Sequence, residues 1–302
     1  MRRTTTCITA IAAILLHASA LQGNRSITPT PAAKKPATEL VMTKGDSMAI
    51  ASLLAEAHRT RPKGSLELFF AKKLLNKPYV AHTLEVADSA EPLVVNLRQL
   101  DCTTLVETVA ALTLCAKNER YSVADYRQML TKLRYRGGHR NGYASRLHYF
   151  SDWIADNSRL GLVGEIDLSN IPKAQKQTVS VSYMSSHPKS YKALRLHPEL
   201  TAEIRNQEQQ LSGTVFTFLP KAAVEDTQQL RKMIHDGDII AITCSKPGLD
   251  IAHLGFAVWQ ADGLHLLNAS QLHKKVVLEP MTLKNYLKRH TTHTGIRVVR
   301  IK

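Results

Sequence analysis

The sequence predicts an α+β domain in which N-terminal helices pack on an antiparallel sheet. In the first half of the chain, apolar residues recur at helical spacing in several separate segments. In the last third, short runs rich in Val, Ile and Leu alternate with turn residues. Helices that precede a group of strands, instead of alternating with them, are typical of the α+β class.

The expected helices follow the apolar spacing. The first pattern runs from Ser47 to about Leu75 and is broken near Arg61-Pro62. Further helices are expected at 101–117, 123–134 and 146–157. The section 160–215 is polar and mixed, which predicts loops and short strands.

The expected strands are "DIIAITC", "AHLGFAVW", "LHLLNAS", "KKVVLEP" and "GIRVVRI". A helix is expected before them in "AAVEDTQQLRKMIHDG", which Asp236-Gly237 closes, and another in "TLKNYLKRH". We find no internal repeat in the chain. Residues 46–302 are therefore predicted to form a single catalytic domain.

The N-terminus has the layout of a secretory signal peptide. Arg2 and Arg3 precede an apolar run that ends in Ala18-Ser19-Ala20, so residues 1–20 are expected to be removed. The apolar run is too short to span a bilayer, and no stable membrane insertion is expected. Residues 21–45 are rich in Pro, Thr, Ala and Lys, which predicts a flexible leader. We therefore expect an exported protein of the periplasm or cell envelope.

The formal charge of +15, from 40 Lys and Arg against 25 Asp and Glu, favours a polyanionic partner. Outside the cytoplasm, the obvious polyanion is peptidoglycan. No nucleic-acid recognition module accompanies the charge, so nucleic acid is not the expected partner. The histidines and cysteines show no zinc-ligand spacing, and no phosphate-binding glycine motif is present. We therefore expect neither a metal nor a cofactor, and the oligomeric state stays open.

Cys102 stands where a helix is expected to begin, in "NLRQLDCTTLVETVAALTLC". Asp101 is a good N-cap, and the helix end is expected to lower the pKa of the thiol. Cys115 would lie about 20 Å away along the same helix, which excludes a disulfide between the two. Cys102 is therefore a packed small residue or a nucleophile, while a bond between Cys115 and Cys244 stays open.

A cysteine nucleophile needs a base and a residue that orients the base. His253 opens the strand "HLGFAVW", in which Gly255 and Ala257 leave room on its face. With a two-residue turn at Asp262-Gly263, Ala257 opposes Asn268. Asn268 is then on the His253 face and His265 on the other, although direct contact with His253 requires a longer loop or a bulge.

Four ordered segments resemble one family of cell-wall hydrolases. They are "KPYVAHTLE", "VVNLRQLDCTTLVET", "YRGGHRNGYASRLHYFSDWIADN" and "DIAHLGFAVW" with "LLNAS", and they run from Lys77 to Ser270. They are similar to the N-acetylmuramoyl-L-alanine amidase-like branch of the NlpC-type papain-like cysteine hydrolases. The resemblance implies a papain-like core and a substrate of peptidoglycan or muropeptides.

Residue by residue, the resemblance implies Cys102 as nucleophile, His253 as general base and acid, and Asn268 as the residue that orients the imidazole. It also implies that Tyr79 supports an oxyanion site together with the Cys102 backbone N–H. The chain departs from the family at His82, where a glycine is usual.

The segment from Arg134 to Asn157 is dense in polar and aromatic side chains. From composition alone it is a solvated basic turn. The resemblance implies instead a substrate-binding wall, in which Arg134 or Arg146 pairs with a carboxylate. The candidates for this wall are Arg134, Tyr135, Tyr143, Ser145 and Arg146.

The expected function is that of a cysteine-dependent N-acetylmuramoyl-L-alanine amidase, which cleaves the amide between the lactyl group and L-Ala. A D-glutamyl-diaminopimelate endopeptidase of the same fold is the first alternative. A non-catalytic, basic wall-binding protein is the second, and an exported nucleic-acid binder is a weaker third.

Overall fold

The computed structural model describes residues 39–86 and 91–302. The expected signal peptide and most of the expected leader lie outside these residues. The predicted leader boundary at residue 45 is too late, because Leu40–Val41 forms strand β1 and helix α1 begins at Lys44. Strand β1 is held by parallel pairing with β2, Leu93–Val94. In the part of the chain that is described, no helix is long and apolar enough to cross a membrane.

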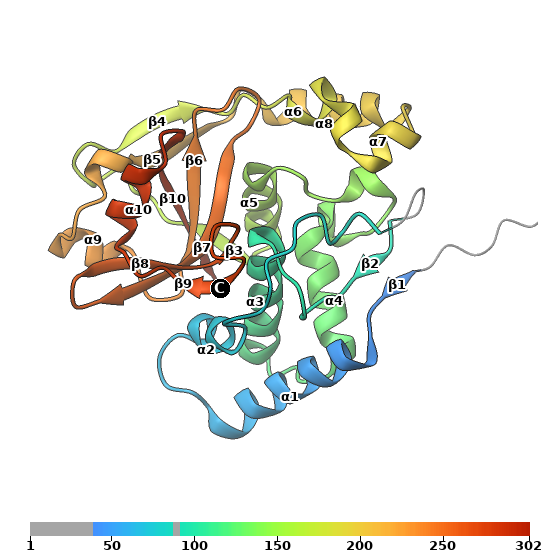
Figure 1. Ribbon diagram of the computed structural model, residues 1–302, viewed down its shortest axis with the longest axis horizontal. Helices are drawn as coiled ribbons and strands as arrows, with labels where there is room; N and C mark the ends of the chain where they lie inside the picture. Colours follow the sequence, from blue (N-terminus) through green and yellow to red (C-terminus); the bar gives the residue numbers. More distant parts are fainter. Residues whose placement is uncertain (1–38, 87–90) are drawn as a thin grey trace, which may run out of the picture. The chain divides into compact units, whose positions relative to one another are not determined.

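A layer of helices forms one side of the domain (Figure 1). Its members are α1 Lys44–Thr60, α2 Leu66–Lys73, α3 Cys102–Lys117, α4 Val123–Arg134 and α5 Phe150–Arg159. Helix α3 is the central one, because it contacts α1, α2 and α4 as well as strands β7, β8 and β10. The predicted helices at 101–117 and 123–134 are confirmed, whereas the one predicted at 146–157 begins only at Phe150.

An eight-stranded antiparallel sheet lies beside the helices in the order β4-β5-β10-β6-β7-β8-β9, with β3 paired to β10. The strands are β3 Val163–Glu165, β4 Gln175–Thr178, β5 Val215–Pro220, β6 Ile239–Cys244, β7 Ile251–Gln260, β8 Gly263–Ser270, β9 Lys275–Leu278 and β10 His293–Ile301. The predicted combination of helices with an antiparallel sheet is confirmed.

The sheet is buried on both faces, which explains its nearly continuous apolar strands. In β6, Ile239 and Ala241 belong to the core shared with the helical layer. The alternate residues Ile240 and Ile242 belong to a second core on the other face. Helix α9, Gln228–Met233, and helix α10, Leu283–Arg289, contribute to this second core.

The section 160–215 contains helices that the sequence pattern did not reveal. They are α6 Tyr183–Ser186, α7 Lys192–Leu196 and α8 Leu200–Leu211. Leu194 and Ile204 on these helices pack with Phe216 and Phe218 of β5 in a third apolar cluster. Short helices expose most of their surface, so their sequence looks polar even though each contributes a few core residues. The helix predicted in "AAVEDTQQLRKMIHDG" is also shorter than expected, since only α9 and a 3₁₀ turn at Lys221–Ala223 form there.

Gly295 is the position in β10 where the backbones approach most closely. A Cβ atom there would lie 2.2 Å from the carbonyl oxygen of Leu219. We predict that Gly295→Ala lowers the free energy of unfolding by about 1–3 kcal/mol or more, because the rigid backbone cannot yield.

Gly164→Ala is the matched control, because its Cβ would meet only the flexible end of Lys302, at 3.1 Å. Urea denaturation of both variants measures the difference. Equal stability of the two variants would contradict the steric argument.

Candidate active site

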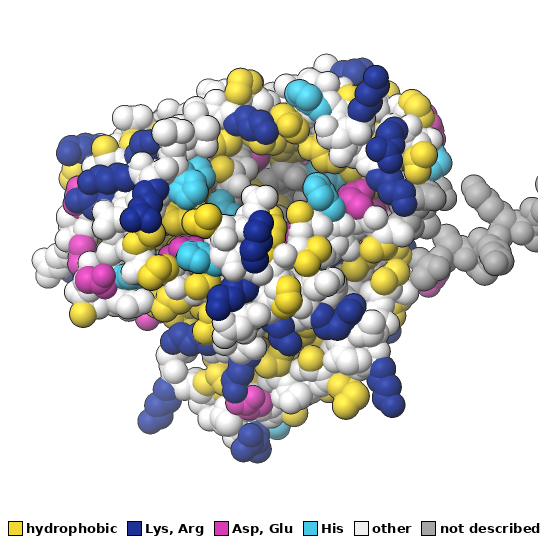
Figure 2. Space-filling view, viewed as in Figure 1, with side chains coloured by type: hydrophobic (Ala, Val, Ile, Leu, Met, Phe, Trp, Pro, Cys, Tyr) yellow, Lys and Arg dark blue, Asp and Glu magenta, His cyan; other side chains and the backbone are white. Residues whose placement is uncertain are grey.

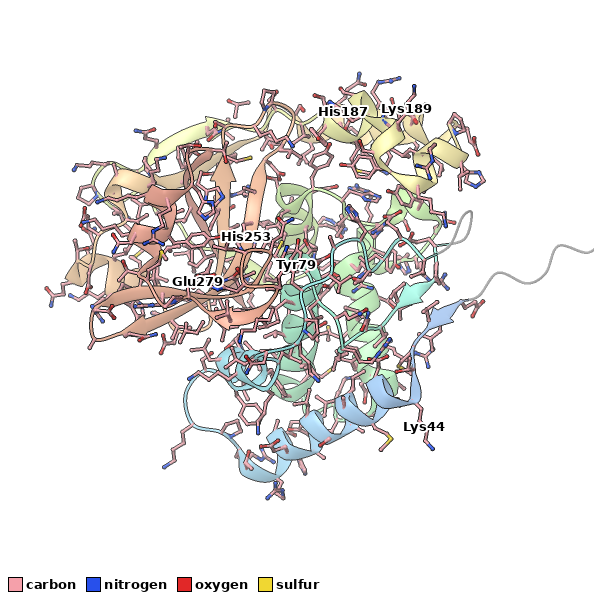
Figure 3. All side chains as sticks on the ribbon, viewed as in Figure 1. Lys44, Tyr79, His187, Lys189, His253 and Glu279 are labelled. Atoms are coloured by element: carbon pink, nitrogen blue, oxygen red, sulfur yellow. The ribbon has the colours of Figure 1, made fainter. Side chains whose placement is uncertain are left out.

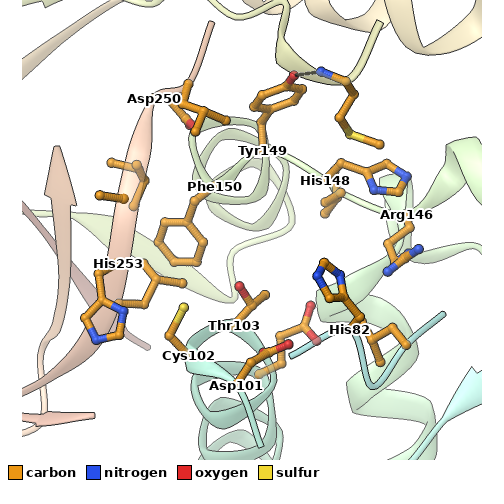
Figure 4. A pocket seen from close by; sticks show the side chains of 18 of the residues that line it. His82, Asp101, Cys102, Thr103, Arg146, His148, Tyr149, Phe150, Asp250 and His253 are labelled. Carbon is orange, nitrogen blue, oxygen red and sulfur yellow. Dashed lines mark hydrogen bonds between the residues drawn. The ribbon is translucent and has the colours of Figure 1, made fainter. Parts of the chain in front are cut away.

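Cys102 is the first residue of α3, and a capping box fixes the helix end beneath it. Asp101 Oδ1 accepts a hydrogen bond from the Thr104 backbone N–H at 2.8 Å, and Thr104 Oγ1 accepts one from the Asp101 N–H at 2.9 Å. The thiol is half-buried and lines a cavity of about 330 Å³ that we call the nucleophile cavity. This cavity also includes His82, Arg146, Tyr149, Asp250 and His253 (Figure 4).

The thiol pKa differs from the expectation. Burial raises the pKa of Cys102 to about 12, and the negative charge of Asp101 adds to the increase. A hydrogen bond with the Leu254 backbone acts in the opposite direction but does not compensate. Desolvation of the thiolate therefore outweighs the lowering expected from the helix end.

His253 lies on β7, the strand that faces the start of α3. The pairing of β6 with β7 shifts between Ile242–His253 and Thr243–Ile251, so Ala252 bulges beside the histidine. Bulges of this kind change the direction of neighbouring side chains. Burial lowers the pKa of His253, which keeps the imidazole neutral and able to accept a proton.

The structure brings Asn268 to His253 by a different register from the predicted one. The turn occupies Ala261 and Asp262, so Gln260 pairs with Gly263 and Ala257 with Leu266. Asn268 therefore lies opposite position 255 and not opposite Ala257, which brings it closer to His253 than predicted. Its side chain is on the predicted face of the sheet. Asn268 Oδ1 lies 2.9 Å from His253 Nε2.

Gly255 lies on β7 opposite Asn268, two residues along the strand from His253. A Cβ atom at Gly255 would lie 2.7 Å from the Leu267 carbonyl oxygen and from the Leu266 side chain. The small residue predicted on this face is thus required by the close approach of β7 and β8.

A buried carboxylate, Glu279, fixes the direction of the Asn268 amide. Asn268 Nδ2 donates to Glu279 Oε1 at 2.9 Å, and His273 Nε2 lies 3.2 Å from Glu279 Oε2. An ionised carboxylate only accepts hydrogen bonds, so the amide must present its NH₂ group to Glu279 and its oxygen to His253. His253 Nε2 must then carry the proton, and the unprotonated nitrogen is Nδ1.

Arg146 forms the opposite wall of the nucleophile cavity. Its guanidinium pairs with Glu85 at 2.6 Å and with Glu91 at 3.1 Å, and it lies over the ring of Tyr143. Both Arg146 and Tyr143 line the cavity, and the Tyr143 hydroxyl is buried without a hydrogen-bond partner. These two members of the predicted substrate-binding wall therefore face the nucleophile.

The other three candidates for that wall have internal roles. The Arg134 side chain is 3% exposed, pairs with Glu107 at 2.7 Å and donates to the Val94 carbonyl. Tyr135 is fully buried and donates to Glu91, while Ser145 closes its own turn on the Gly142 carbonyl. The expectation that Arg134 pairs with a substrate carboxylate is not supported, because the side chain already has a partner inside the core.

Tyr79 lies close to Cys102. Burial raises the pKa of the Tyr79 hydroxyl, and the neighbouring Cys102 and Asp101 act in the same direction. Its backbone N–H donates to the Lys274 carbonyl at 2.9 Å, which ties this segment to the β8–β9 turn. Nearby, His82 has φ of 60°, in the left-handed region that favours glycine. The loop at His82 therefore has a backbone conformation that is typical of glycine, and the His82 imidazole lines the nucleophile cavity (Figure 4).

Several residues of the site were missed by sequence reasoning. Met184 of α6, Tyr191 just before α7, and Asp250 just before β7 line the nucleophile cavity. Tyr149 holds these helices in place, since its hydroxyl donates to Glu208 at 2.6 Å and accepts from the Met184 N–H. No spacing in the sequence connects these residues, because they approach one another only through the packing of the third apolar cluster.

In the described part of the chain, the other cysteines and histidines form neither a disulfide nor a metal site. Cys115 and Cys244 are both buried free thiols, so the bond between them that the sequence left open is absent. Among the described residues, no group of His, Cys, Asp and Glu could hold a metal ion.

The fold and the site together define a mixed α/β protein in which a cysteine faces an amide-oriented histidine, the arrangement that cysteine hydrolases use. The family comparison agrees with this class. A model of the AmiA-like family, described as N-acetylmuramoyl-L-alanine amidase-like, matches residues 69–296, and the chain belongs to this family. A search of curated proteins found no match.

Several solved structures are similar. An N-acetylmuramoyl-L-alanine amidase from Bacteroides uniformis has 44% identity and a TM-score of 0.73, over 78% of this chain and 97% of that one. A protein from Bacteroides fragilis described as a candidate xylanase has 42% identity and a TM-score of 0.71, over 76% and 98% of the two chains. A Legionella pneumophila protein with 22% identity and a TM-score of 0.66, over 85% and 94%, shows the same fold.

We predict that Arg134→Met destabilises the protein by about 3–5 kcal/mol, because it leaves the Glu107 charge buried and unpaired. The double variant Arg134→Met/Glu107→Gln removes that charge and should recover part of the loss. Urea denaturation measures both variants. A folded, fully stable Arg134→Met protein would contradict the structural role and return Arg134 to the candidates for substrate binding.

Proposed function

We propose that the protein is a cysteine-dependent N-acetylmuramoyl-L-alanine amidase with a papain-like core of the NlpC type. The observation that carries the proposal is the shared cavity of Cys102 and His253, with His253 Nε2 held by Asn268 at 2.9 Å. Membership of the amidase-like family supports the choice of bond, which joins the lactyl group of N-acetylmuramic acid to L-Ala.

The first step transfers a proton from the Cys102 thiol to the His253 imidazole. As Cys102 Sγ attacks the amide carbonyl, its proton passes to His253 Nδ1, the nitrogen that Asn268 leaves free. The C–S bond forms while the carbonyl becomes an oxyanion. The imidazolium then protonates the leaving amine of L-Ala, and the C–N bond breaks to leave a thioester on Cys102.

The second step returns the enzyme to its resting state. A water molecule loses a proton to His253 and attacks the thioester, and the released thiolate takes the proton back. The Cys102 backbone N–H, at the free end of α3, and the Tyr79 hydroxyl are the proposed donors to both oxyanions. The Asp101 cap keeps the helix end in place without occupying the Cys102 N–H.

The carboxylates of the cavity do not favour glycoside hydrolysis, although one similar structure is described as a candidate xylanase. That chemistry requires a pair of carboxyl groups free to act as acid and as base or nucleophile. Each of the four carboxylates that line the nucleophile cavity has an internal partner: Glu85 with Arg146, Asp101 with Thr104, Glu107 with Arg134 and Asp250 with Ser151.

We also propose where the protein acts. The signal-peptide pattern of residues 1–20 supports export to the periplasm or cell envelope, where peptidoglycan is present. Lys and Arg side chains are spread over the face shown in Figure 2, which suits an anionic polymer.

Purified muropeptides and mass spectrometry test the bond and the nucleophile together. We expect the wild-type protein to release the intact stem peptide, and Cys102→Ala to be at least about a thousandfold slower. Cys244→Ala is the matched control, because that thiol is also free but lies outside the nucleophile cavity.

Cleavage after D-glutamate would replace the amidase by the endopeptidase. Binding to sacculi without turnover, in wild type and variant alike, would favour the non-catalytic wall-binding protein. A Cys102→Ala protein as active as wild type would remove the thiol from the mechanism.

Exchanging the amide of Asn268 with the carboxylate of Glu279 tests the chain of hydrogen bonds that orients His253. Singly, Asn268→Asp and Glu279→Gln are expected to lower kcat by about 10–100-fold, as with other residues that orient a histidine. Asn268→Asp sets two carboxylates against each other, and Glu279→Gln allows the amide of Asn268 to turn. The double variant restores one acceptor facing His253 and one donor facing Asp at 268, so it should recover at least about tenfold.

The pH profile supplies a second readout. Burial lowers the pKa of His253, so the acidic limb of kcat/KM in the wild type is expected below pH 6.5. A carboxylate at position 268 raises the pKa of His253, so the limb in the double variant moves to higher pH. Additive losses in the double variant, with no movement of the limb, would show that Glu279 only supports folding.

A further inference from the structure

A second cavity opens on the other side of His253. It has a volume of about 460 Å³, and we call it the histidine cavity after His253, His290 and His293. Ser270 and Lys274, from the end of β8 and the turn after it, and Tyr286 of α10 complete its main lining. His253 and Ala252 also line the nucleophile cavity, so the imidazole stands between the two spaces.

The two cavities differ in charge. The nucleophile cavity contains four carboxylates, one arginine, Arg146, and three histidines, His82, His148 and His253, together with several aromatic rings. Among the described residues that line the histidine cavity, none is acidic. Its basic side chains are Lys274 and the imidazoles of His253, His290 and His293, and burial lowers the pKa of His253 and of His293. The nearby Glu279 is already held by Asn268 and His273.

Among the described contacts, the side chains of Lys274 and His290 have no hydrogen bond or ion pair. Lys274 is exposed and has no ion pair in the described structure, although φ of 57° and the bond from the Tyr79 N–H to its carbonyl hold its backbone in place. In the described structure, the contacts of the His290 ring are with Tyr286 at 4.6 Å and with His293 at 4.5 Å. His293 is 7% exposed, and its Nδ1 is buried without a hydrogen-bond partner.

The proposed reaction determines which part of the substrate would lie in the histidine cavity. The imidazolium must reach the nitrogen of the leaving group, so the leaving peptide must lie next to His253. The acyl side carries the sugar, whose hydroxyl groups suit carboxylate acceptors and aromatic rings. The leaving side begins at L-Ala and carries the carboxylates of D-glutamate and the residues after it.

We propose that the histidine cavity binds the carboxylates of the departing stem peptide, with Lys274 and His290 as the donors. The inference rests on the proposed amidase function, because it assigns the sugar to one side of the scissile amide and the peptide to the other. It makes Lys274 and His290 specificity residues that recognise charge beyond the reacting bond.

The test compares two substrates that differ by one group. N-acetylmuramoyl-L-alanyl-γ-D-glutamate has a free α-carboxylate, and its isoglutamine analogue has a neutral amide at that position. We expect the full-length protein to prefer the acid, and Lys274→Gln/His290→Gln to lower kcat/KM for the acid by about tenfold, chiefly through KM. Hydrolysis of the amide analogue should change by less than about twofold.

Lys44→Gln/His58→Gln is the matched control, because it removes the same two side-chain types from α1 (Figure 3 shows Lys44 far from His253). It should leave both substrates unaffected. A loss that is equal for the acid and the amide, or no loss at all, would overturn the assignment of the cavity.

A binding measurement separates this inference from the function on which it rests. In a Cys102→Ala background, calorimetry with the free tripeptide L-alanyl-γ-D-glutamyl-diaminopimelate should show affinity that Lys274→Gln/His290→Gln weakens. If the wild type does not cleave the lactyl amide but this dependence is found, the amidase proposal fails and the binding site remains. If cleavage occurs and neither binding nor KM depends on Lys274 and His290, the site is wrong and the amidase remains.

Discussion

The hydrogen bond from Asn268 to the buried carboxylate of Glu279 determines how the rest of the site is oriented. The carboxylate only accepts, so the amide has one direction, the imidazole has one tautomer, and one nitrogen is left for the thiol. Each group in this chain is buried, where a misdirected polar group is costly. In the proposed mechanism, a carboxylate that does not touch the thiol thus sets the geometry of proton transfer.

The fold provides the rigidity that this chain requires. Helix α3 is buried along most of its length and rests on β7, so the position of its first residue depends on the packing of the whole helical layer. The sheet beside it is covered on both faces, which fixes the register of β7 against β8. Tyr79, His253 and Glu279 lie near the junction of the two layers (Figure 3).

Burial also decides how the nucleophile is activated. It raises the pKa of Cys102 and lowers the pKa of His253, so both charged forms are disfavoured in the resting site. In the proposed mechanism, the proton passes from the thiol to the imidazole as the substrate carbonyl begins to accept charge. The negative charge of Asp101 contributes in the same direction, although its structural role is to cap the helix.

The amino-acid sequence was enough to place the central helices and to choose the residues of the proposed mechanism. Apolar spacing placed the helices at 101–117 and 123–134, and the order of segments led to Cys102, His253 and Asn268. Local hydrogen bonding and side-chain periodicity act over a few residues, which is why such patterns can be read directly. Even the face of Asn268 was predictable, because side chains alternate along a strand.

Three features of the site could be seen only in the folded chain: the register of β7 and β8, the internal pairing of Arg134 with Glu107, and the place of Glu279 behind Asn268. The tertiary structure also decided the two cavities on either side of His253. These features join residues far apart in the chain, and they depend on turn length, burial and the packing of helices against the sheet. Local patterns contain none of this information, because the pKa of a thiol or the partner of an arginine is set by what the fold places around it.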